Sequence, residues 1–140
     1  VDGARGNSGA ILAQFLSGVS ERVADAEVLR PAELAEAASA GADAARKALS
    51  EPREGTILSV IRAFADGLRK ASREGARDAR EGFETALAAA RAALADTPRQ
   101  LAVLRQAGVV DAGAQGFVDL LEGIADYLRS GRLRVASRVE

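Results

Sequence analysis

This sequence predicts an all-α fold, an antiparallel helical bundle or barrel, and two observations support the prediction. Hydrophobic residues make up 48% of the 140 residues, whereas aromatic residues make up 4%. This balance suits closely packed helices, because strands favour β-branched and aromatic side chains. Apolar residues also recur three and four positions apart along most of the chain, which places them on one face of a helix. About six helices are expected, and short connectors make neighbouring helices antiparallel.

The first two helices are marked by an apolar stripe and by a proline. Ile11, Phe15 and Val19 share one face of an expected helix over residues 8–24. Pro31 suits the first position of a second helix, because the N–H group that proline lacks has no intrahelical partner there.

Breaks in the pattern delimit the third and fourth helices. Residues 51–55 include a proline and a glycine and end the second helix. Thr56 follows them and can cap the third helix. Gly75 marks the next turn, after which residues 78–95 form an alanine-rich fourth helix.

The rest of the chain holds two more helices and a polar tail. Thr97 is expected to cap a short helix that Pro98 opens and that runs through residue 106. A connector is expected over residues 108–113 and a last long helix over residues 114–129. We expect residues 1–131 to form one domain. Residues 132–140 are too polar for a core and are expected to be a tail or a linker to a following domain.

Composition excludes several classes of function. The chain has no cysteine and no histidine, which removes disulfides, the serine–histidine triad and most zinc sites. Nineteen Lys and Arg residues against 20 Asp and Glu residues do not give the basic balance of a nucleic-acid binder. No apolar run reaches the roughly 20 residues of a membrane span. We therefore expect a cytoplasmic protein with neither a nucleic-acid partner nor a membrane span.

The most informative segment is residues 2–9, with the sequence DGARGNSG, just before the first apolar stripe. Its glycines allow a ligand to approach the backbone closely, and the N-terminus of the following helix attracts anions. Arg5 adds a forked cation that suits phosphate, while Asn7 or Ser8 can bind phosphate or cap the helix. The segment matches neither the P-loop nor the dinucleotide pattern, because no strand precedes it. The alternative is a plain capped turn.

Two more segments combine glycine with small polar residues at the start of a helix. One is EGT, which contains Gly55 and Thr56, and the other is DAGAQG over residues 111–116. Taken singly, the first is a helix cap and the second a connector. If the three helices point the same way, however, their N-termini gather at one end and can surround one polyanion.

The strings GARGNSGAILAQFL, EGTILSVIR and AGVVDAGAQGF resemble, in this order, three motifs of the nucleotide-binding domain of bacterial fatty acid kinases. Those domains belong to the superfamily of the dihydroxyacetone kinase L subunit. The resemblance covers residues 1 to about 131 and implies a barrel of eight antiparallel helices, about six of them in this chain, with ATP bound across one rim. Ala112, where the dihydroxyacetone kinase branch has proline, favours the fatty acid kinase branch.

The resemblance assigns nucleotide-binding residues but no catalytic residue in this chain. The residues that match the family's nucleotide-contacting positions are Gly3, Ala4, Arg5, Gly6, Asn7, Ser8, Gly9, Gly55, Thr56, Asp111, Ala112, Gly113 and Ala114.

One departure from the family concerns metal binding. The family holds magnesium with aspartates of a DGDTG-type loop that precedes the glycine-rich segment, and this chain has no such loop. ATP and Mg²⁺ are therefore expected in the intact parent protein, whereas this chain alone should bind nucleotide weakly and not catalyse. We also expect the first helix or two of the barrel to be missing, which would expose an apolar face. Another chain, self-association or rearranged helices would cover that face.

The resemblance implies a kinase that transfers the γ-phosphate of ATP to a fatty acid carboxylate held by a fatty-acid-binding partner protein. One alternative is a dihydroxyacetone kinase L-type subunit, which phosphorylates a small ketose. A second alternative, of another class, is a non-catalytic helical module that binds a partner or a lipid.

Overall fold

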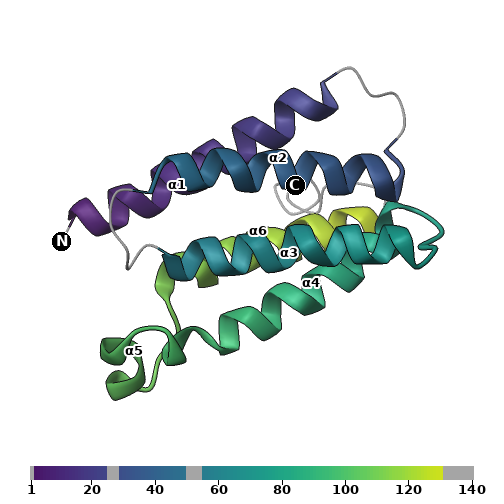
Figure 1. Ribbon diagram of the computed structural model, residues 1–140. Helices are drawn as coiled ribbons and strands as arrows, with labels where there is room; N and C mark the ends of the chain where they lie inside the picture. The colour runs from purple at the N-terminus through teal and green to yellow at the C-terminus, as the bar shows by residue number, and fades with distance from the viewer. Residues whose placement is uncertain (1, 25–28, 50–54, 131–140) are drawn as a thin grey trace, which may run out of the picture.

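The computed structural model describes residues 2–24, 29–49 and 55–130, and these residues form helices joined by short connections (Figure 1). No strand occurs in these ranges, so the prediction of an all-helical bundle with six α-helices is confirmed. The expected tail over residues 132–140 lies outside the described residues. The elements are α1 (Asp2–Val23), α2 (Pro31–Lys47), α3 (Gly55–Arg73), α4 (Ala79–Ala95), the 3₁₀ turn η2 (Thr97–Arg99), α5 (Ala102–Ala107) and α6 (Ala112–Ser130).

Helices that follow one another pack side by side. α1 packs on α2, α2 on α3 and α3 on α4, while α6 lies against α4, α3 and α1. α1, α3 and α6 run in one direction, and α2 and α4 return in the other (Figure 1). The starts of α1, α3 and α6 therefore lie at the same end of the bundle. The excursion formed by η2 and α5 projects at this end, between the end of α4 and the start of α6.

Local chemistry fixes several helix ends. The Asp78 carboxylate accepts a hydrogen bond from the Glu81 N–H at 2.9 Å and so caps α4. Gly75 and Gly108 have φ angles of 90° and 70°, a left-handed conformation that glycine adopts without steric penalty and that ends α3 and α5. Pro31 is the first residue of α2, as predicted.

One predicted boundary is wrong, and two other helices start within two residues of the predicted positions. α1 begins at Asp2 rather than at residue 8, because a nucleated helix gains one hydrogen bond for each residue it adds. That gain offsets the helix penalty of about 1 kcal/mol per glycine. α3 begins one residue before Thr56, so this threonine lies inside the first turn and does not cap the helix. α6 begins at Ala112 rather than at residue 114, because Asp111 caps it.

The prediction of one helix over residues 98–106 with Thr97 as its cap is also wrong. The segment is divided into η2 and α5 by Leu101, whose extended backbone has φ −131° and ψ 126°. Thr97 does not act as a cap, since its hydroxyl donates back to the Leu94 carbonyl oxygen at 2.8 Å.

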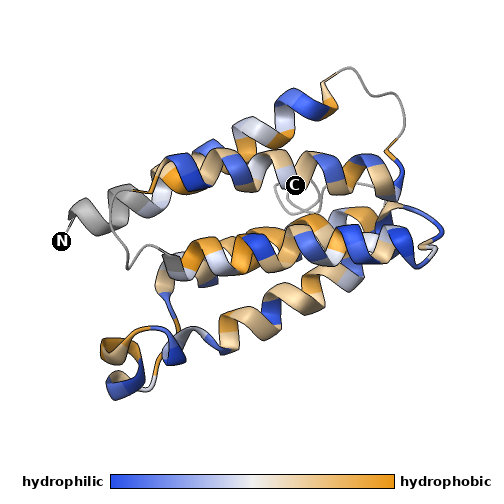
Figure 2. Ribbon diagram, viewed as in Figure 1, coloured by the Kyte–Doolittle hydropathy of each residue, from blue (hydrophilic) through white to orange (hydrophobic). Residues whose placement is uncertain are grey.

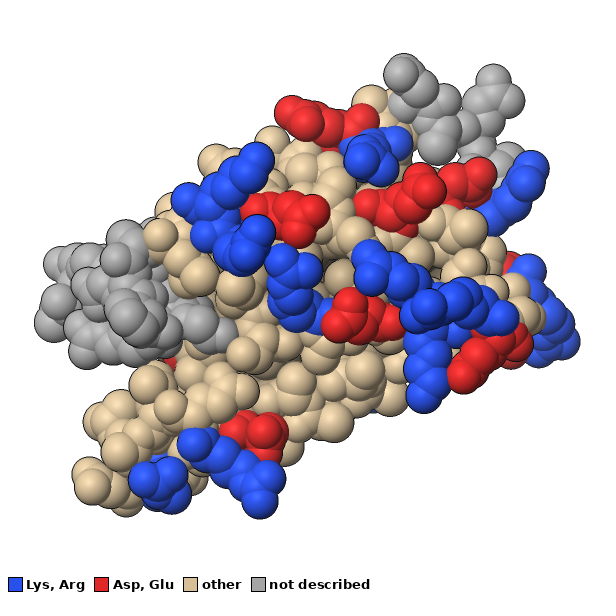
Figure 3. Space-filling model, in the orientation of Figure 1, with Lys and Arg blue, Asp and Glu red and all other residues tan. Residues whose placement is uncertain are grey.

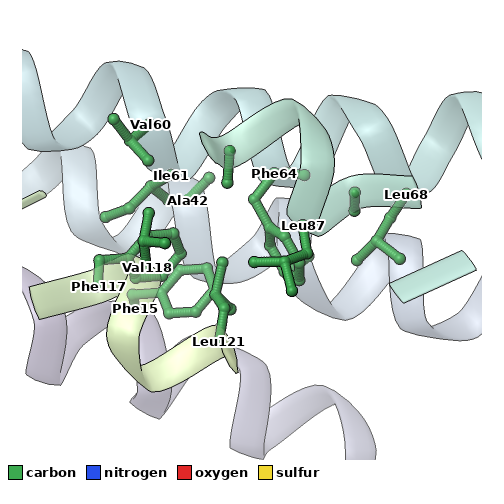
Figure 4. Packing of buried hydrophobic residues seen from close by; sticks show 14 of the residues in the cluster. Phe15, Ala42, Val60, Ile61, Phe64, Leu68, Leu87, Phe117, Val118 and Leu121 are labelled. Carbon is green, nitrogen blue, oxygen red and sulfur yellow. The ribbon is translucent and has the colours of Figure 1, made fainter. Parts of the chain in front are cut away.

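The four phenylalanines of the chain form a continuous series of edge-to-face contacts in the core. Three of them, Phe15, Phe64 and Phe117, are labelled in Figure 4. The ring centroids of Phe15 in α1 and Phe117 in α6 lie 5.2 Å apart, and those of Phe64 in α3 and Phe117 lie 6.0 Å apart. Phe83 in α4 lies 5.2 Å from Phe64. Phe117 thus contacts a phenylalanine of each of the other two helices that start at the shared end.

Small residues let the remaining helices approach closely. Along α2 and α3, hydrophilic and hydrophobic residues alternate in the short repeats of an amphipathic helix (Figure 2). The buried face of α2 consists of alanine and glycine. α1 crosses α2 at Gly18 and Gly41, where a Cβ added to Gly18 would lie 2.8 Å from the Gly41 Cα atom. Alanine is therefore too large at this crossing.

Ion pairs on the surface join α4 to α6. Arg129 donates through Nε to Glu84 at 2.8 Å, and Arg91 donates to Glu122 at 3.0 Å. The hydrogen bond from Arg129 lowers the pKa of the Glu84 carboxyl below its usual 4.5. Such exposed pairs stabilise proteins only slightly, so packing rather than charge holds α6 in place.

Few large apolar side chains are exposed among the described residues. They are Leu16, Leu29, Val103, Val109 and Tyr127. They are distributed over α1, α5, α6 and two connecting segments, and an apolar face that needs a cover stays a prediction. No helix in the described ranges combines the length and the hydropathy that crossing a bilayer requires.

We predict that Gly18→Ala destabilises the protein although alanine favours a helix. The new Cβ would overlap the Gly41 backbone, and overpacking of this kind costs about 1–3 kcal/mol. Gly123→Ala in α6 is the matched control, because a Cβ there meets nothing within 4 Å. Urea unfolding followed by circular dichroism compares the two variants. Equal free energies of unfolding would contradict the close crossing.

Candidate functional site

The three segments that the sequence singles out lie at the shared end of the bundle (Figure 1). Residues 2–9 are the first turns of α1, Gly55 and Thr56 open α3, and residues 111–114 cap and open α6. The hypothesis that these helices point the same way is therefore confirmed, while nucleotide binding by their residues stays a prediction.

The segment of residues 2–9 contacts the segment of residues 111–116. A Cβ added to Gly113 would lie 2.6 Å from the Ser8 Oγ atom and 3.2 Å from the Ser8 Cβ atom. The same added atom would lie 3.4 Å from Asp111 Oδ2. Because Gly113 has no side chain, the start of α6 can lie directly against Ser8 and close to the capping carboxylate.

Hydrogen bonds define the start of α6. The Ala114 N–H donates to Asp111 Oδ2 at 2.9 Å, and the Gln115 N–H donates to the Asp111 carbonyl oxygen at 2.9 Å. Within the part of the chain that the structure describes, the N–H groups of Ala112 and Gly113 have no such partner. They are thus two donors at the positive end of a helix dipole, an arrangement that attracts an anion.

Thr97 lies behind this cap, and the sequence did not reveal its role. The Asp111 N–H donates to Thr97 Oγ1 at 3.1 Å, and the Thr97 hydroxyl donates to the Leu94 carbonyl oxygen at 2.8 Å. Thr97 is 0% exposed. Threonine beside a proline usually signals a cap, and nothing in the local pattern identifies a partner 14 residues away.

The start of α3 offers less side-chain chemistry than expected. Thr56 is 3% exposed, so its side chain is inside the protein. A nucleotide contact at this position would therefore come from the backbone. Gly55 precedes it as the first residue of α3.

The prediction of a glycine-rich loop before the first helix is wrong. Gly3, Ala4, Arg5, Gly6, Asn7, Ser8 and Gly9 lie within α1 and not in a loop before it. In a regular helix, the N–H groups of residues 6–9 bind carbonyl oxygens four residues earlier. Only the N–H groups of the first four helical residues remain available to an anion.

The described residues do not fit a magnesium site. No three or more of their Asp, Glu, His or Cys side chains lie close enough together to hold a metal ion. Protein-bound Mg²⁺ is held by carboxylates together with substrate phosphates and water. Asp111 brings a carboxylate to the shared end, but one of its oxygens caps α6.

A separate cleft of about 480 Å³ lies between α1, α2 and α3 and includes Arg22, Arg69 and Arg73. Arg22 pairs with Glu36 at 3.8 Å, and Arg69 donates to the Ser39 hydroxyl at 2.7 Å. Glu36 and Asp43 also line the cleft, and acidic and basic side chains are interspersed over the face of the molecule that Figure 3 shows. The cleft is thus largely charge-compensated, and none of the predicted site residues lines it.

We predict that Ser8 and Gly113 are energetically coupled. Gly113→Ala forces Ser8 to move, whereas Ser8→Ala in the same protein relieves part of the overlap. A double-mutant cycle on the free energy of unfolding should give an interaction of roughly 0.5 kcal/mol or more, as contacting residues do. The control cycle pairs Ser8→Ala with Gly116→Ala, where an added Cβ has nothing within 4 Å. Additivity in both cycles would show that the helices do not meet at Ser8.

Comparison with known proteins places the chain in a family. Residues 1–126 match the family model described as the DAK2 domain. An uncharacterized protein of Staphylococcus saprophyticus is 38% identical over 135 residues, covering 96% of this chain and 24% of that protein. Uncharacterized proteins of Staphylococcus haemolyticus and Staphylococcus aureus are 40% and 37% identical, covering 86% and 94% of this chain and 22% and 24% of theirs.

This chain therefore spans about a quarter of the length of these relatives. The family match covers most of the chain, including all three segments at the shared end. The chain belongs to the DAK2-domain family, the family of the dihydroxyacetone kinase L subunit.

Proposed function

We propose that this chain provides the phosphate-binding end of an ATP-dependent kinase domain. In the complete protein, this domain transfers the γ-phosphate of ATP to the carboxylate of a fatty acid held by a fatty-acid-binding partner protein. The observation that supports it is the convergence of the starts of α1, α3 and α6, with Ser8 against Gly113. Three helix N-termini at one place suit a triphosphate, which carries several negative charges.

In the proposed reaction, a carboxylate oxygen of the fatty acid attacks the γ-phosphorus atom. The bond between that phosphorus and the oxygen bridging to the β-phosphate breaks, and the products are an acyl phosphate and ADP. The protein's part in such a transfer is positioning and electrostatic stabilisation. Here the N–H groups of Ala112 and Gly113, together with Arg5, would bind phosphate oxygens.

The start of α1 must change for the whole glycine-rich segment to contact the nucleotide. The N–H groups of Gly6 and Gly9 are used inside the helix, so they can bind phosphate only if the first turns open. Glycine makes this opening easier, because each glycine lowers helix stability by about 1 kcal/mol relative to alanine. We propose that the segment opens when the triphosphate binds.

Magnesium, which such transfers use to bridge and neutralise phosphate oxygens, would be held by carboxylates outside the described residues. We therefore propose that this chain alone binds nucleotide weakly and does not transfer phosphate. We also propose that the bundle associates with a second copy of itself or with another chain. The proposed location of the protein is the cytoplasm.

The choice of fatty acid over ketose rests on one residue. Ala112 stands where the dihydroxyacetone kinase branch has proline, which favours the fatty acid kinase branch. The family match itself supports the second candidate, an L-type subunit that phosphorylates dihydroxyacetone. The third candidate is a helical module that binds a partner or a lipid without catalysis.

The complete protein is expected to phosphorylate a fatty acid in the presence of ATP, Mg²⁺ and its fatty-acid-binding partner. Release of ADP and trapping of the acyl phosphate with hydroxylamine measure the reaction. Dihydroxyacetone, offered without the partner, is the control acceptor. Phosphorylation of dihydroxyacetone alone would overturn the choice of acceptor, and no transfer to either acceptor would favour the non-catalytic module.

In the complete protein, Arg5→Ala is expected to raise the KM for ATP about tenfold or more. The reason is that a hydrogen bond to a charged group contributes roughly 1.5–3 kcal/mol. Arg73→Ala is the matched control, since Arg73 ends α3 at the opposite end of the bundle and should leave the KM unchanged. Steady-state kinetics with varied ATP separates the two variants. An unchanged KM for Arg5→Ala would remove this residue from the phosphate site.

A further inference from the structure

Thr97 lies behind the shared end of the bundle and joins two helices that are distant along the chain. It is one of two buried polar residues in the described ranges, the other being Thr56. Its hydroxyl donates to the Leu94 carbonyl oxygen in the last turn of α4 and accepts from the Asp111 N–H just before α6. A hydroxyl has one proton and two lone pairs, so both bonds form at once.

These two bonds close the excursion formed by η2 and α5. The excursion leaves the bundle after α4 and returns at Asp111. Leu101, Leu104 and Val110 in it are only partly buried, and Val103 is 66% exposed. Few apolar contacts therefore fix the path of the returning chain. Val110 packs against the core beside Asp111, and the buried Thr97 hydroxyl binds the backbone N–H of Asp111 itself.

The position of Asp111 then sets the start of α6. Its carboxylate caps Ala114, its carbonyl oxygen accepts from Gln115, and Gly113 is held against Ser8. The N–H groups of Ala112 and Gly113 lie within this capped turn. A shift of Asp111 would move or loosen both donors, although Thr97 itself has no contact with them.

We propose that Thr97 is a positioning residue for nucleotide binding: through its hydroxyl it holds Asp111, and through Asp111 it aims the first N–H groups of α6. This inference rests on the proposed function, since it assigns those N–H groups to the phosphates. Valine has nearly the shape of threonine but no hydroxyl, so it removes both bonds without opening a cavity. Serine keeps the hydroxyl.

The test uses the complete protein with Thr97→Val and Thr97→Ser. We expect Thr97→Val to raise the KM for ATP about fivefold or more and to leave the KM for the acceptor unchanged, and Thr97→Ser to restore the KM for ATP to within about twofold. Val118→Ala is the control for a general loss of stability, because Val118 lies in the core of α6. It should lower the melting temperature without a selective change in the KM for ATP.

Hydrogen exchange in the nucleotide-free protein checks the link independently of activity. A peptide covering residues 109–115 should exchange faster in Thr97→Val and at the wild-type rate in Thr97→Ser. Unchanged exchange would overturn the link between Thr97 and Asp111. Faster exchange with an unchanged KM for ATP would overturn the positioning role and leave the proposed function intact. A wild-type protein that neither binds nor turns over ATP would contradict the proposed function itself, and the positioning role with it.

Discussion

The contacts of Phe117 with Phe15 and Phe64 are the constraint on which the shared end of the bundle depends. They join α1, α3 and α6, the three helices that run in one direction. Parallel helices bring their positive N-termini together, which is unfavourable by roughly 0.3–1 kcal/mol for each terminus near a like charge. The negative C-termini of α2 and α4, which end at the same side of the bundle, offset part of this repulsion. Burying a phenylalanine is favourable by about 1.5–3 kcal/mol, so the aromatic core outweighs this repulsion. The N–H groups of Ala112 and Gly113 at that end are the donors that an anion would use.

Packing elsewhere places the same three helices. Gly18 and Gly41 let α1 lie close to α2, and α2 in turn packs on α3. Gly67 does the same for α3 and α4, since an added Cβ would lie 2.9 Å from the Ala86 Cα atom. The low aromatic content and the many alanines are thus the composition that close helix crossings require.

Most of the fold follows from the sequence because helical periodicity and helix-ending residues are local signals. Pro31 opens α2, Gly75 ends α3 and the apolar stripe with Phe15 lies in the core, all as predicted. The start of α1 and the place of Thr56 inside the first turn of α3 do not follow from it. Glycine and threonine are compatible with a loop, a cap or a first turn, and tertiary context decides among them.

The candidate site follows from the sequence only in part. The sequence predicts three helix starts that gather at one end if their helices run the same way, and the helix directions place them there. The contact of Ser8 with Gly113 joins residues on the first and last helices, and the bond of Asp111 to Thr97 spans an excursion. Neither interaction can be recognised from the local sequence, because each forms only when distant segments pack together.

The most direct measurement is a crystal structure of the complete protein with a non-hydrolysable ATP analogue. Our account predicts phosphate oxygens at about 3 Å from the N–H groups of Ala112 and Gly113, with the first turns of α1 opened around the triphosphate. A triphosphate bound in the cleft beside Arg69 and Arg73, with the starts of α1 and α6 unchanged, would contradict it.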